Sequence, residues 1–252
     1  MNESNYIYGR NAVLEAINSG QNIEKIFISF TAKGAAVTAI YTAAKKNSIP
    51  LVRYDRKKFD RLERDALPRE ANSQGVIALA GQIEYTPIDD MIRKAYERSE
   101  HPVIVVLDGI NDPHNLGAIA RSAECSGAAG MVLPERNSAP VSPAAVKASA
   151  GALEHLPVAR EGNLGVALDR LKEAGFWIVG SDISGDKYYY EMDYKMPVAL
   201  ITGSEGRGMR PSIANRCDFL IKIPMRGEIE SLNASVATGV ILFEILRSRQ
   251  SD

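Results

Sequence analysis

The chain has 252 residues, of which 45% are hydrophobic and 24% charged, a composition typical of a globular protein with a substantial buried core. Two distant cysteines, Cys125 and Cys217, and three dispersed histidines predict neither a disulfide scaffold nor a metal site. The polar N-terminus MNESNYIYGR lacks the apolar core of a signal peptide, and the longest apolar run, near 236–246, is too short to span a bilayer. We therefore expect a cytoplasmic protein without membrane contact.

Charge is unevenly distributed, although the net charge is only −1. Residues 1–80 hold 12 Lys/Arg against 8 Asp/Glu, or +4, and the remainder holds 18 against 23, or −5. A basic cluster comprises Arg53, Arg56, Lys57, Lys58, Arg61, Arg64 and Arg69. Acidic residues are interleaved with it (Asp55, Asp60, Glu63, Asp65), so a phosphate-binding surface and a solvated helix face are both open interpretations.

The first 80 residues alternate between β and α patterns. Residues 6–19 predict a short amphipathic helix that ends at Gly20. Further along, strands are predicted at Ile23–Ser29, Leu51–Tyr54 and Gly75–Ala80, and helices at Ala35–Asn47 and 55–66. Such alternation predicts a small α/β domain over residues 1–81.

Residues 82–101 are interpreted as a linker. Thr86 is a candidate helix cap, Pro87 suits the first helical position, and Ile88–Arg98 can form a short helix. A flexible tether is the alternative, but the apolar spacing of Ile88, Met91, Ile92 and Ala95 favours a partly docked helix.

Residues 102–252 predict a second α/β domain. The continuous apolar run Val103–Leu107 is typical of a strand covered on both faces. Helices are predicted at about Leu116–Ser126 and Asn233–Arg249, and further strands near Gly130–Leu133, Leu156–Ala159, Phe176–Gly180, Pro197–Thr202 and Phe219–Ile223. We expect a mostly parallel sheet with helices on both faces.

The position of the glycine-rich turn disfavours a dinucleotide-binding oxidoreductase. No G-x-G-x-x-G follows the first strand of this domain; the glycine-dense turn GSEGRG at Gly203–Gly208 follows a late strand instead. No G-x-x-x-x-G-K-[ST] phosphate loop occurs either. A nucleotide-dependent oxidoreductase therefore stays only as a weaker alternative.

Three stretches carry a family resemblance. They read NDPHNLGAIARSA (Asn111–Ala123), VALITGSEGRGMR (Val198–Arg210) and IPMRGEIESLNASVA (Ile223–Ala237). By itself the last stretch is an ordinary capped helix start. In this order the three resemble the signature motifs of the SpoU (TrmH) 2′-O-ribose RNA methyltransferases of the SPOUT superfamily, and the resemblance covers about residues 103–248.

This resemblance implies a C-terminal trefoil knot in the sheet domain that holds S-adenosylmethionine. The family's cofactor contacts map onto Gly203, Ile223 and Leu232, and Thr202 and Met225 lie nearby and are included among the expected cofactor-binding residues. Its catalytic residues map onto Asn115, Arg121, Glu205, Ser231 and Asn233.

Each catalytic residue has an expected role. Asn115 is expected to cap the helix that carries Arg121. A guanidinium is too basic to serve as an ordinary base, so we expect Arg121 to bind phosphate and stabilise the developing alkoxide. Glu205 is expected to orient Arg121 or the loop amides, and Ser231 and Asn233 to hold the ribose region while capping the last helix.

Other polar residues allow alternatives. His114 is a candidate general base, although its position is not a fixed functional one in the family pattern. Glu154 and His155 are interpreted as structural. Arg207 and Arg210 are either RNA contacts or solvated charges.

The front of the chain bears on the substrate. YGRNAVLEAI and NSQGVIALA (Asn72–Ala80) resemble the ribosomal-protein-like RNA-binding domain of some SpoU enzymes, which points to the RlmB-like subgroup that methylates a guanosine of 23S rRNA. Transfer RNA is the alternative substrate, and a non-catalytic RNA-binding assembly factor the alternative function.

The resemblance also implies a homodimer through the SPOUT domain. The last helix is apolar enough to serve as the interface, with Ala234, Ala237, Val240, Ile241 and Ile245. Burial of these residues against the helix's own sheet is the alternative.

Overall fold

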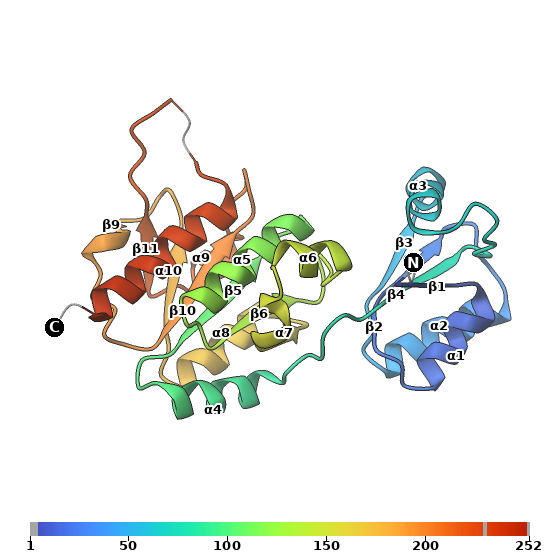
Figure 1. Cartoon of the computed structure of the whole chain (residues 1–252), viewed down its shortest axis with the longest axis horizontal. Coiled ribbons are helices and arrows are strands. Elements are labelled where there is room, and N and C mark those ends of the chain that lie inside the picture. Colours follow the sequence, from blue (N-terminus) through green and yellow to red (C-terminus); the bar gives the residue numbers. More distant parts are fainter. Residues whose placement is uncertain (1–4, 229–230, 251–252) are drawn as a thin grey trace. The chain divides into compact units, whose positions relative to one another are not determined.

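The computed structural model describes residues 5–228 and 231–250 of the chain (Figure 1). The chain forms two compact units. The first runs up to Glu84 and includes Pro140–Pro143, and the second comprises Tyr85–Ala139 and the chain from Ala144 onward.

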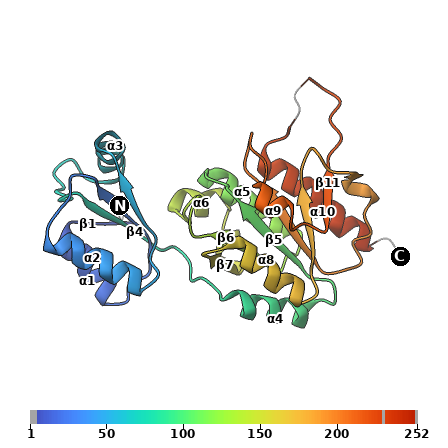
Figure 2. The ribbon, with the colours of Figure 1, turned by 180° about the vertical axis from the view of Figure 1, so that it is seen from behind.

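The first unit is a four-stranded sheet in the order β1-β4-β2-β3. Its strands are β1 (Tyr6–Tyr8), β2 (Ile23–Ser29), β3 (Leu51–Tyr54) and β4 (Val76–Ala80), and β4 runs antiparallel to both β1 and β2. Helices α1 (Arg10–Asn18) and α2 (Ala35–Lys46) cover one face, and α3 (Arg56–Ala66) covers the other (Figure 2).

The helix predicted over residues 6–19 begins later in the structure, at Arg10, so the prediction for its first residues was wrong. Tyr6–Tyr8 pair with β4 as a strand, because alternating aromatic residues suit a pleated, half-buried surface. Gly9, with φ of +91°, separates this strand from α1.

Gly75 packs closely against Ala32 in the first unit, and replacement of this glycine is expected to destabilise the protein. A Cβ at Gly75 would lie 2.9 Å from the Ala32 Cβ, and the residue has φ of +77°. Gly20 has nearly the same φ, +74°, with nothing within 4 Å, and so serves as a matched control. We expect Gly75→Ala to lower the free energy of unfolding by about 1–3 kcal/mol more than Gly20→Ala in urea titrations. Equal losses would show that only the backbone conformation matters.

The second unit is built on a seven-stranded sheet in the order β7-β6-β5-β10-β8-β11-β9, in which every pair is parallel. The strands are β5 (Val103–Asp108), β6 (Gly130–Pro134), β7 (Val158–Glu161), β8 (Trp177–Ser181), β9 (Lys187–Tyr188), β10 (Val198–Gly203) and β11 (Phe219–Lys222). The mostly parallel α/β sheet was therefore predicted correctly, whereas β9 was not anticipated. The strand expected at Leu156 begins at Val158, because a short helix occupies the residues up to His155.

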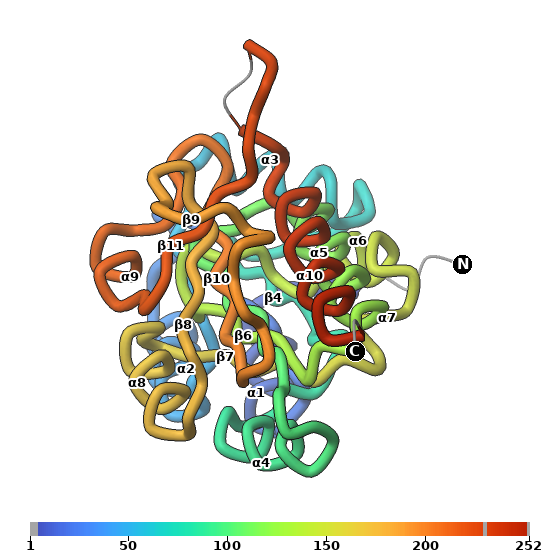
Figure 3. The backbone as a smooth tube through the Cα atoms, turned by 90° about the vertical axis from the view of Figure 1, so that its left-hand side faces the viewer, coloured from blue at the N-terminus to red at the C-terminus, as the bar shows by residue number. Residues whose placement is uncertain are grey.

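Helices cover both faces of this sheet (Figure 3). One face packs against α4 (Ile88–Arg98), α8 (Leu164–Glu173) and α9 (Pro211–Ala214). The other carries α5 (Pro113–Cys125) and α10 (Ala234–Gln250), which pack against each other. Shorter elements are α6 (Pro143–Ala148), α7 (Ala152–His155) and the 3₁₀ turn η1 (Tyr189–Glu191).

Helix α4 packs into the core of the second unit. Ile88, Met91 and Ala95 are at most 1% exposed, and the Thr86 amide donates to the Val158 carbonyl. The docked-helix interpretation of this segment therefore agrees with the structure. The cap differs from expectation: Pro87 precedes the helix, and no side chain caps it.

The parallel arrangement places the carboxyl ends of β8, β10 and β11 along one edge of the sheet. Ligands of open α/β sheets bind outside such edges. Within the described part of the chain, no helix combines the length and apolar character that crossing a bilayer requires.

Candidate functional site

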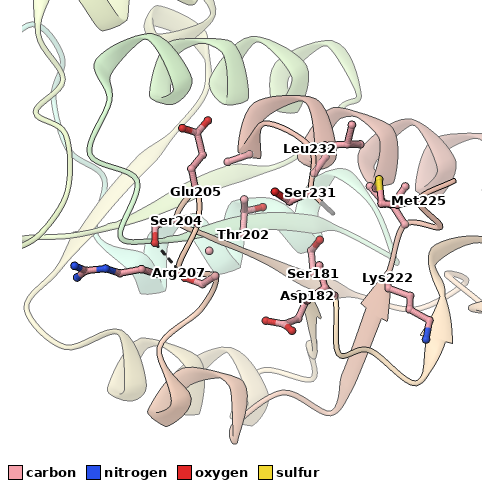
Figure 4. Close-up of a pocket in the computed structure, with 17 residues that line it drawn as sticks. Ser181, Asp182, Thr202, Ser204, Glu205, Arg207, Lys222, Met225, Ser231 and Leu232 are labelled. Carbon is pink, nitrogen blue, oxygen red and sulfur yellow. Dashed lines mark hydrogen bonds between the residues drawn. The ribbon is translucent and has the colours of Figure 1, made fainter. Parts of the chain in front are cut away.

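A pocket of about 350 Å³ lies at this edge (Figure 4). The carboxyl ends of three strands and the loops that follow them line it: Ser181–Ile183 at the end of β8, Gly203–Gly208 at the end of β10, and Ile223 with Met225 after β11. Ser231, Leu232, Ala234 and Ala237, at the entrance to α10, complete the wall. All five predicted cofactor residues, Thr202, Gly203, Ile223, Met225 and Leu232, thus line one pocket.

The glycine loop folds back tightly on itself. The Ser204 amide donates to the Gly208 carbonyl at 3.0 Å, and the Gly208 amide donates back to the Ser204 carbonyl at 2.9 Å. A Cβ at Gly203 would lie 2.3 Å from the Gly208 carbonyl carbon and the Met209 nitrogen. Only glycine therefore fits at position 203, because the backbone of residues 208 and 209 passes too close to leave room for a side chain.

A buried carboxylate anchors the far end of this loop. Asp108, at the end of β5, is 2% exposed and accepts hydrogen bonds from the Arg210 backbone amide at 2.8 Å and from Arg210 Nε at 2.7 Å. Arg210 is thus paired with a buried carboxylate, which neither of its two interpretations, an RNA contact or a solvated charge, included. Arg207 lies at the pocket edge, and its side chain points away from the other labelled residues in Figure 4.

Thr202 connects the pocket floor to α10. Its hydroxyl lies 2.8 Å from that of Thr238, and the Thr238 hydroxyl donates to the Ala234 carbonyl at 2.7 Å. Both threonines are at most 3% exposed. This buried pair fixes the distance between the end of β10 and the first turn of α10.

Three predicted catalytic residues form one hydrogen-bonded cluster. Asn115 Nδ2 donates to Glu205 Oε1 at 2.8 Å, Asn233 Nδ2 donates to Asn115 Oδ1 at 3.0 Å, and Asn233 Nδ2 also donates to Glu205 Oε1. The cluster therefore ties α5, the glycine loop and the entrance to α10 together. In the same position, Asn233 Oδ1 caps α10 by accepting from the Ser235 amide at 2.9 Å.

The capping role expected for Asn115 was wrong. Asn115 does not cap α5, because Asp112 does so by accepting from the His114 amide at 2.9 Å. Glu205 accepts from two side-chain amides, and in the described residues no hydrogen bond joins it to Arg121.

The structure does not bring Arg121 into this cluster. Arg121 is exposed on α5 and lies outside the pocket lining. Ser231 lines the pocket, whereas His114, Glu154 and His155 are exposed and do not.

The loop after β8 was missed by sequence reasoning. Ser181, Asp182 and Ile183 line the pocket, and Asp182 Oδ1 accepts from the Ser184 amide at 2.9 Å and the Ser184 hydroxyl at 2.7 Å. They follow directly after a predicted parallel strand, so the rule that ligands bind beyond carboxyl ends is the signal that would have found them.

The pocket lining suits a nucleoside with a charged tail. Ile223, Met225 and Leu232 offer apolar contacts for an aromatic ring, and the loop backbones offer N–H and C=O groups at its edge. Ser181, Asp182 and Ser231 offer partners for hydroxyl and ammonium groups. Among residues 5–228 and 231–250 no group of His, Cys, Asp and Glu side chains is arranged to hold a metal ion.

Two family profiles match the sequence. The SpoU rRNA Methylase family matches residues 102–243, and a domain described as RNA 2′-O ribose methyltransferase substrate binding matches residues 6–86. The chain is 42% identical over 248 residues to YacO of Bacillus subtilis (strain 168), which is assigned to the TrmH family of tRNA/rRNA methyltransferases, with 98% of this chain and 97% of YacO covered.

Solved structures agree with this assignment. An AdoMet-bound rRNA methyltransferase from Sinorhizobium meliloti matches with TM-score 0.60 and 28% identity, covering 96% of this chain and 86% of that one. A TrmH/SpoU tRNA-modifying enzyme from A. aeolicus matches with TM-score 0.55 and 29% identity, covering 65% of this chain and 84% of its own. The profile match, the near full-length similarity to YacO and the pocket built from the signature motifs establish that the chain belongs to the SpoU (TrmH) family of RNA methyltransferases.

Proposed function

We propose that this protein transfers a methyl group from S-adenosylmethionine to a ribose 2′-hydroxyl in structured RNA. The observation that carries the proposal is the pocket at the strand ends, because the cluster of Asn115, Glu205 and Asn233 adjoins it and three signature motifs converge there.

The pocket walls would hold the cofactor largely through loop backbone and apolar side chains. Ile223, Met225 and Leu232 would contact the adenine, and Thr202 and Gly203 shape the floor of the pocket. When bound, S-adenosylmethionine supplies an electrophilic methyl group on a sulfonium centre. The residues of this chain then have to position the RNA sugar and assist loss of its hydroxyl proton.

Positioning is the contribution we assign to the amide cluster and to Ser231. Asn233 holds the entrance to α10 and the glycine loop in one arrangement, and Ser231 lies on the pocket wall beside them. Fixing the acceptor oxygen behind the methyl carbon contributes a large part of such a reaction's acceleration. Arg121, exposed on α5, binds an RNA phosphate and stabilises the developing alkoxide.

We also propose that the segments around this pocket form the trefoil knot of the SPOUT fold. Membership of the SpoU family supports this proposal, as does the hydrogen bond from Asn233 to Glu205, which brings the entrance to α10 against the glycine loop. Because a knot must be threaded, refolding from urea is expected to be slow compared with that of an unknotted sheet of this size.

Ribosomal RNA is the substrate that we favour, as a guanosine of 23S rRNA. The rRNA methyltransferase from Sinorhizobium meliloti aligns with 96% of this chain, whereas the A. aeolicus tRNA-modifying enzyme aligns with 65%. The substrate-binding profile over residues 6–86 also supports a substrate that needs a second binding unit. Transfer RNA is the second candidate.

One experiment tests the proposal and its alternatives. Ribose methylation is mapped by mass spectrometry in rRNA and tRNA from a deletion strain, with and without the plasmid-borne protein. We expect a single 23S rRNA ribose to lose its methyl group and regain it on complementation. A lost tRNA methyl group selects the second candidate, and intact methylation together with no calorimetric binding of S-adenosylmethionine favours a non-catalytic RNA-binding protein.

We propose that α10 also forms a homodimer interface, but through other residues than the sequence indicated. Ala234, Ile241 and Ile245 are buried within the unit itself. Val236 and Phe243 lie seven positions apart on one face of the helix and are 50% and 48% exposed. In a monomer these two apolar side chains would be in contact with water.

The dimer proposal predicts a change in mass. Phe243→Glu is expected to convert a dimer to a monomer in light scattering at micromolar concentration, because a charge would be buried without a partner. Ile183→Glu, which changes a 69% exposed residue at the pocket, is the control and should keep the wild-type mass. A wild-type protein of one-chain mass would remove this proposal.

A further inference from the structure

Four loops meet at one end of the sheet in the first unit. Strands β2 and β3 are parallel and end there at Ser29 and Tyr54, while β4 runs the other way and begins there at Val76. We call this surface the loop end and define it as residues 8–10, 30–34, 53–58 and 72–75. It holds six basic residues, Arg10, Lys33, Arg53, Arg56, Lys57 and Lys58, against one acidic residue, Asp55.

The centre of the loop end is an aromatic ring beneath a guanidinium. Phe30 is 52% exposed, the Arg53 Cζ lies 4.9 Å from its ring centroid, and Arg53 Nη2 donates to the Phe30 carbonyl at 2.9 Å. A single exposed phenylalanine is ordinary in a folded protein. An arginine fixed to both the ring and the carbonyl is more specific, because it makes a flat surface that is aromatic and cationic together.

The loops around this surface are held rigidly. The Phe30 amide donates to the Tyr54 carbonyl at 2.9 Å, and the Ser29 amide donates to the Gly75 carbonyl at 2.9 Å. Arg10 Nε donates to the Gln74 carbonyl at 3.1 Å. A surface ordered in advance loses less conformational entropy when a ligand binds.

The charges along the rest of α3 are arranged differently. Arg61 pairs with Asp65 at 3.6 Å within it, and Arg56 of the loop end pairs with Asp60 in the next turn at 3.7 Å; all four side chains are more than half exposed. These i,i+4 pairs are typical of a solvated helix face. The positive excess of the first unit is therefore concentrated at the loop end, which includes the first turn of α3, and not along the rest of that helix.

We propose that the loop end is the surface through which the first unit binds RNA. An unpaired base stacks on the exposed part of Phe30 and on the Arg53 guanidinium plane, and Arg10 and Lys33 bind the flanking phosphates. The inference rests on the proposed function, since it takes the partner to be the RNA substrate. It assigns a role to the motifs around Arg10 and Gln74, which the pocket of the second unit does not use.

The test is binding of a fluorescein-labelled single-stranded poly(A) oligonucleotide to the full chain, followed by fluorescence anisotropy. Loss of one stacked base is expected to weaken binding by about 5- to 100-fold in Phe30→Ala, whereas Phe30→Trp should bind at least as tightly as wild type. Arg53→Ala should weaken binding and reduce the slope of log K against log salt by about 0.7, whereas Phe30→Ala should leave that slope unchanged. Lys46→Ala, an exposed lysine at the opposite end of α2, is the charge-matched control.

Three results would overturn the inference. They are Phe30→Ala binding within twofold of wild type, Phe30→Trp losing affinity in a folded protein, or Lys46→Ala losing as much as Arg53→Ala. If Phe30→Ala unfolds, the Phe30→Trp and Arg53→Ala results decide. Calorimetry with S-adenosylmethionine separates this failure from that of the proposed function: a protein that binds the cofactor and poly(A) but is insensitive to Phe30 refutes only the loop-end surface.

Discussion

Replacing Arg121 with alanine is expected to lower the rate of ribose methylation about 100- to 1,000-fold, because the guanidinium is proposed to stabilise charge that develops only in the transition state. The same change should leave the affinity for S-adenosylmethionine and the unfolding temperature unaltered. Arg121 is exposed on α5 and lies outside the pocket lining, and its side chain makes no hydrogen bond within the described residues. A loss of activity without a loss of binding or stability is thus the distinguishing outcome.

The controls for this prediction separate charge, geometry and position. Arg121→Lys keeps the charge but loses the planar fork, so an intermediate rate is expected. Arg98→Ala removes another exposed helix arginine, on α4 of the same unit, and should have no effect on rate. If His114→Ala lost methylation as completely as Arg121→Ala, the assignment of Arg121 would be refuted in favour of a histidine base.

Gly203→Ala is expected to damage both stability and cofactor binding. The added Cβ would lie 2.3 Å from two backbone atoms of the returning loop, and backbone cannot move aside as a flexible side chain can. We expect a loss of about 3 kcal/mol in the free energy of unfolding and loss of measurable S-adenosylmethionine binding in calorimetry. The cause is displacement of the loop that carries Ser204, Glu205 and Gly208 along the pocket wall.

Two other glycines calibrate this result. Gly227 has nothing within 4 Å of an added Cβ and no left-handed φ, so Gly227→Ala should be neutral. Gly206, inside the same loop, has φ of +76° but open space, so Gly206→Ala should cost only about 1 kcal/mol of backbone strain. Wild-type affinity in Gly203→Ala would mean that the close contact of the loop does not shape the pocket.

Local patterns predicted most elements of the fold because their physical basis is local. The apolar run at Val103–Leu107 became β5, and the spacing of Ile88, Met91 and Ala95 became the buried face of α4. The helix prediction failed at Tyr6–Tyr8 because strand formation there depends on pairing with β4, some 70 residues later. Strand β9, two residues long, likewise exists only through its pairing with β11.

In the candidate site, too, some features could be predicted from local sequence and others depend on contacts between distant residues. The motif residues Asn115, Glu205 and Asn233 were identified in the sequence, and the capping of α10 by Asn233 was predicted correctly. The role of Asn115 was not, because it looked like a cap when it was considered alone. In the structure the capping role belongs to Asp112, and Asn115 joins two residues that follow it by 90 and 118 positions. Such contacts arise from packing, and no local pattern encodes them.

By itself the sequence determined the α/β class and the late position of the glycine loop, because periodicity and glycine placement are properties of short stretches, and its three motifs supplied the resemblance to a family of RNA methyltransferases. Only the tertiary structure decided that Asp182 joins the pocket, that Arg210 pairs with a buried Asp108, and that Arg121 stands apart from the amide cluster. The physical reason is that parallel strands far apart in the chain bring their carboxyl ends to one edge, and the meeting of side chains there depends on the order of the strands in the sheet.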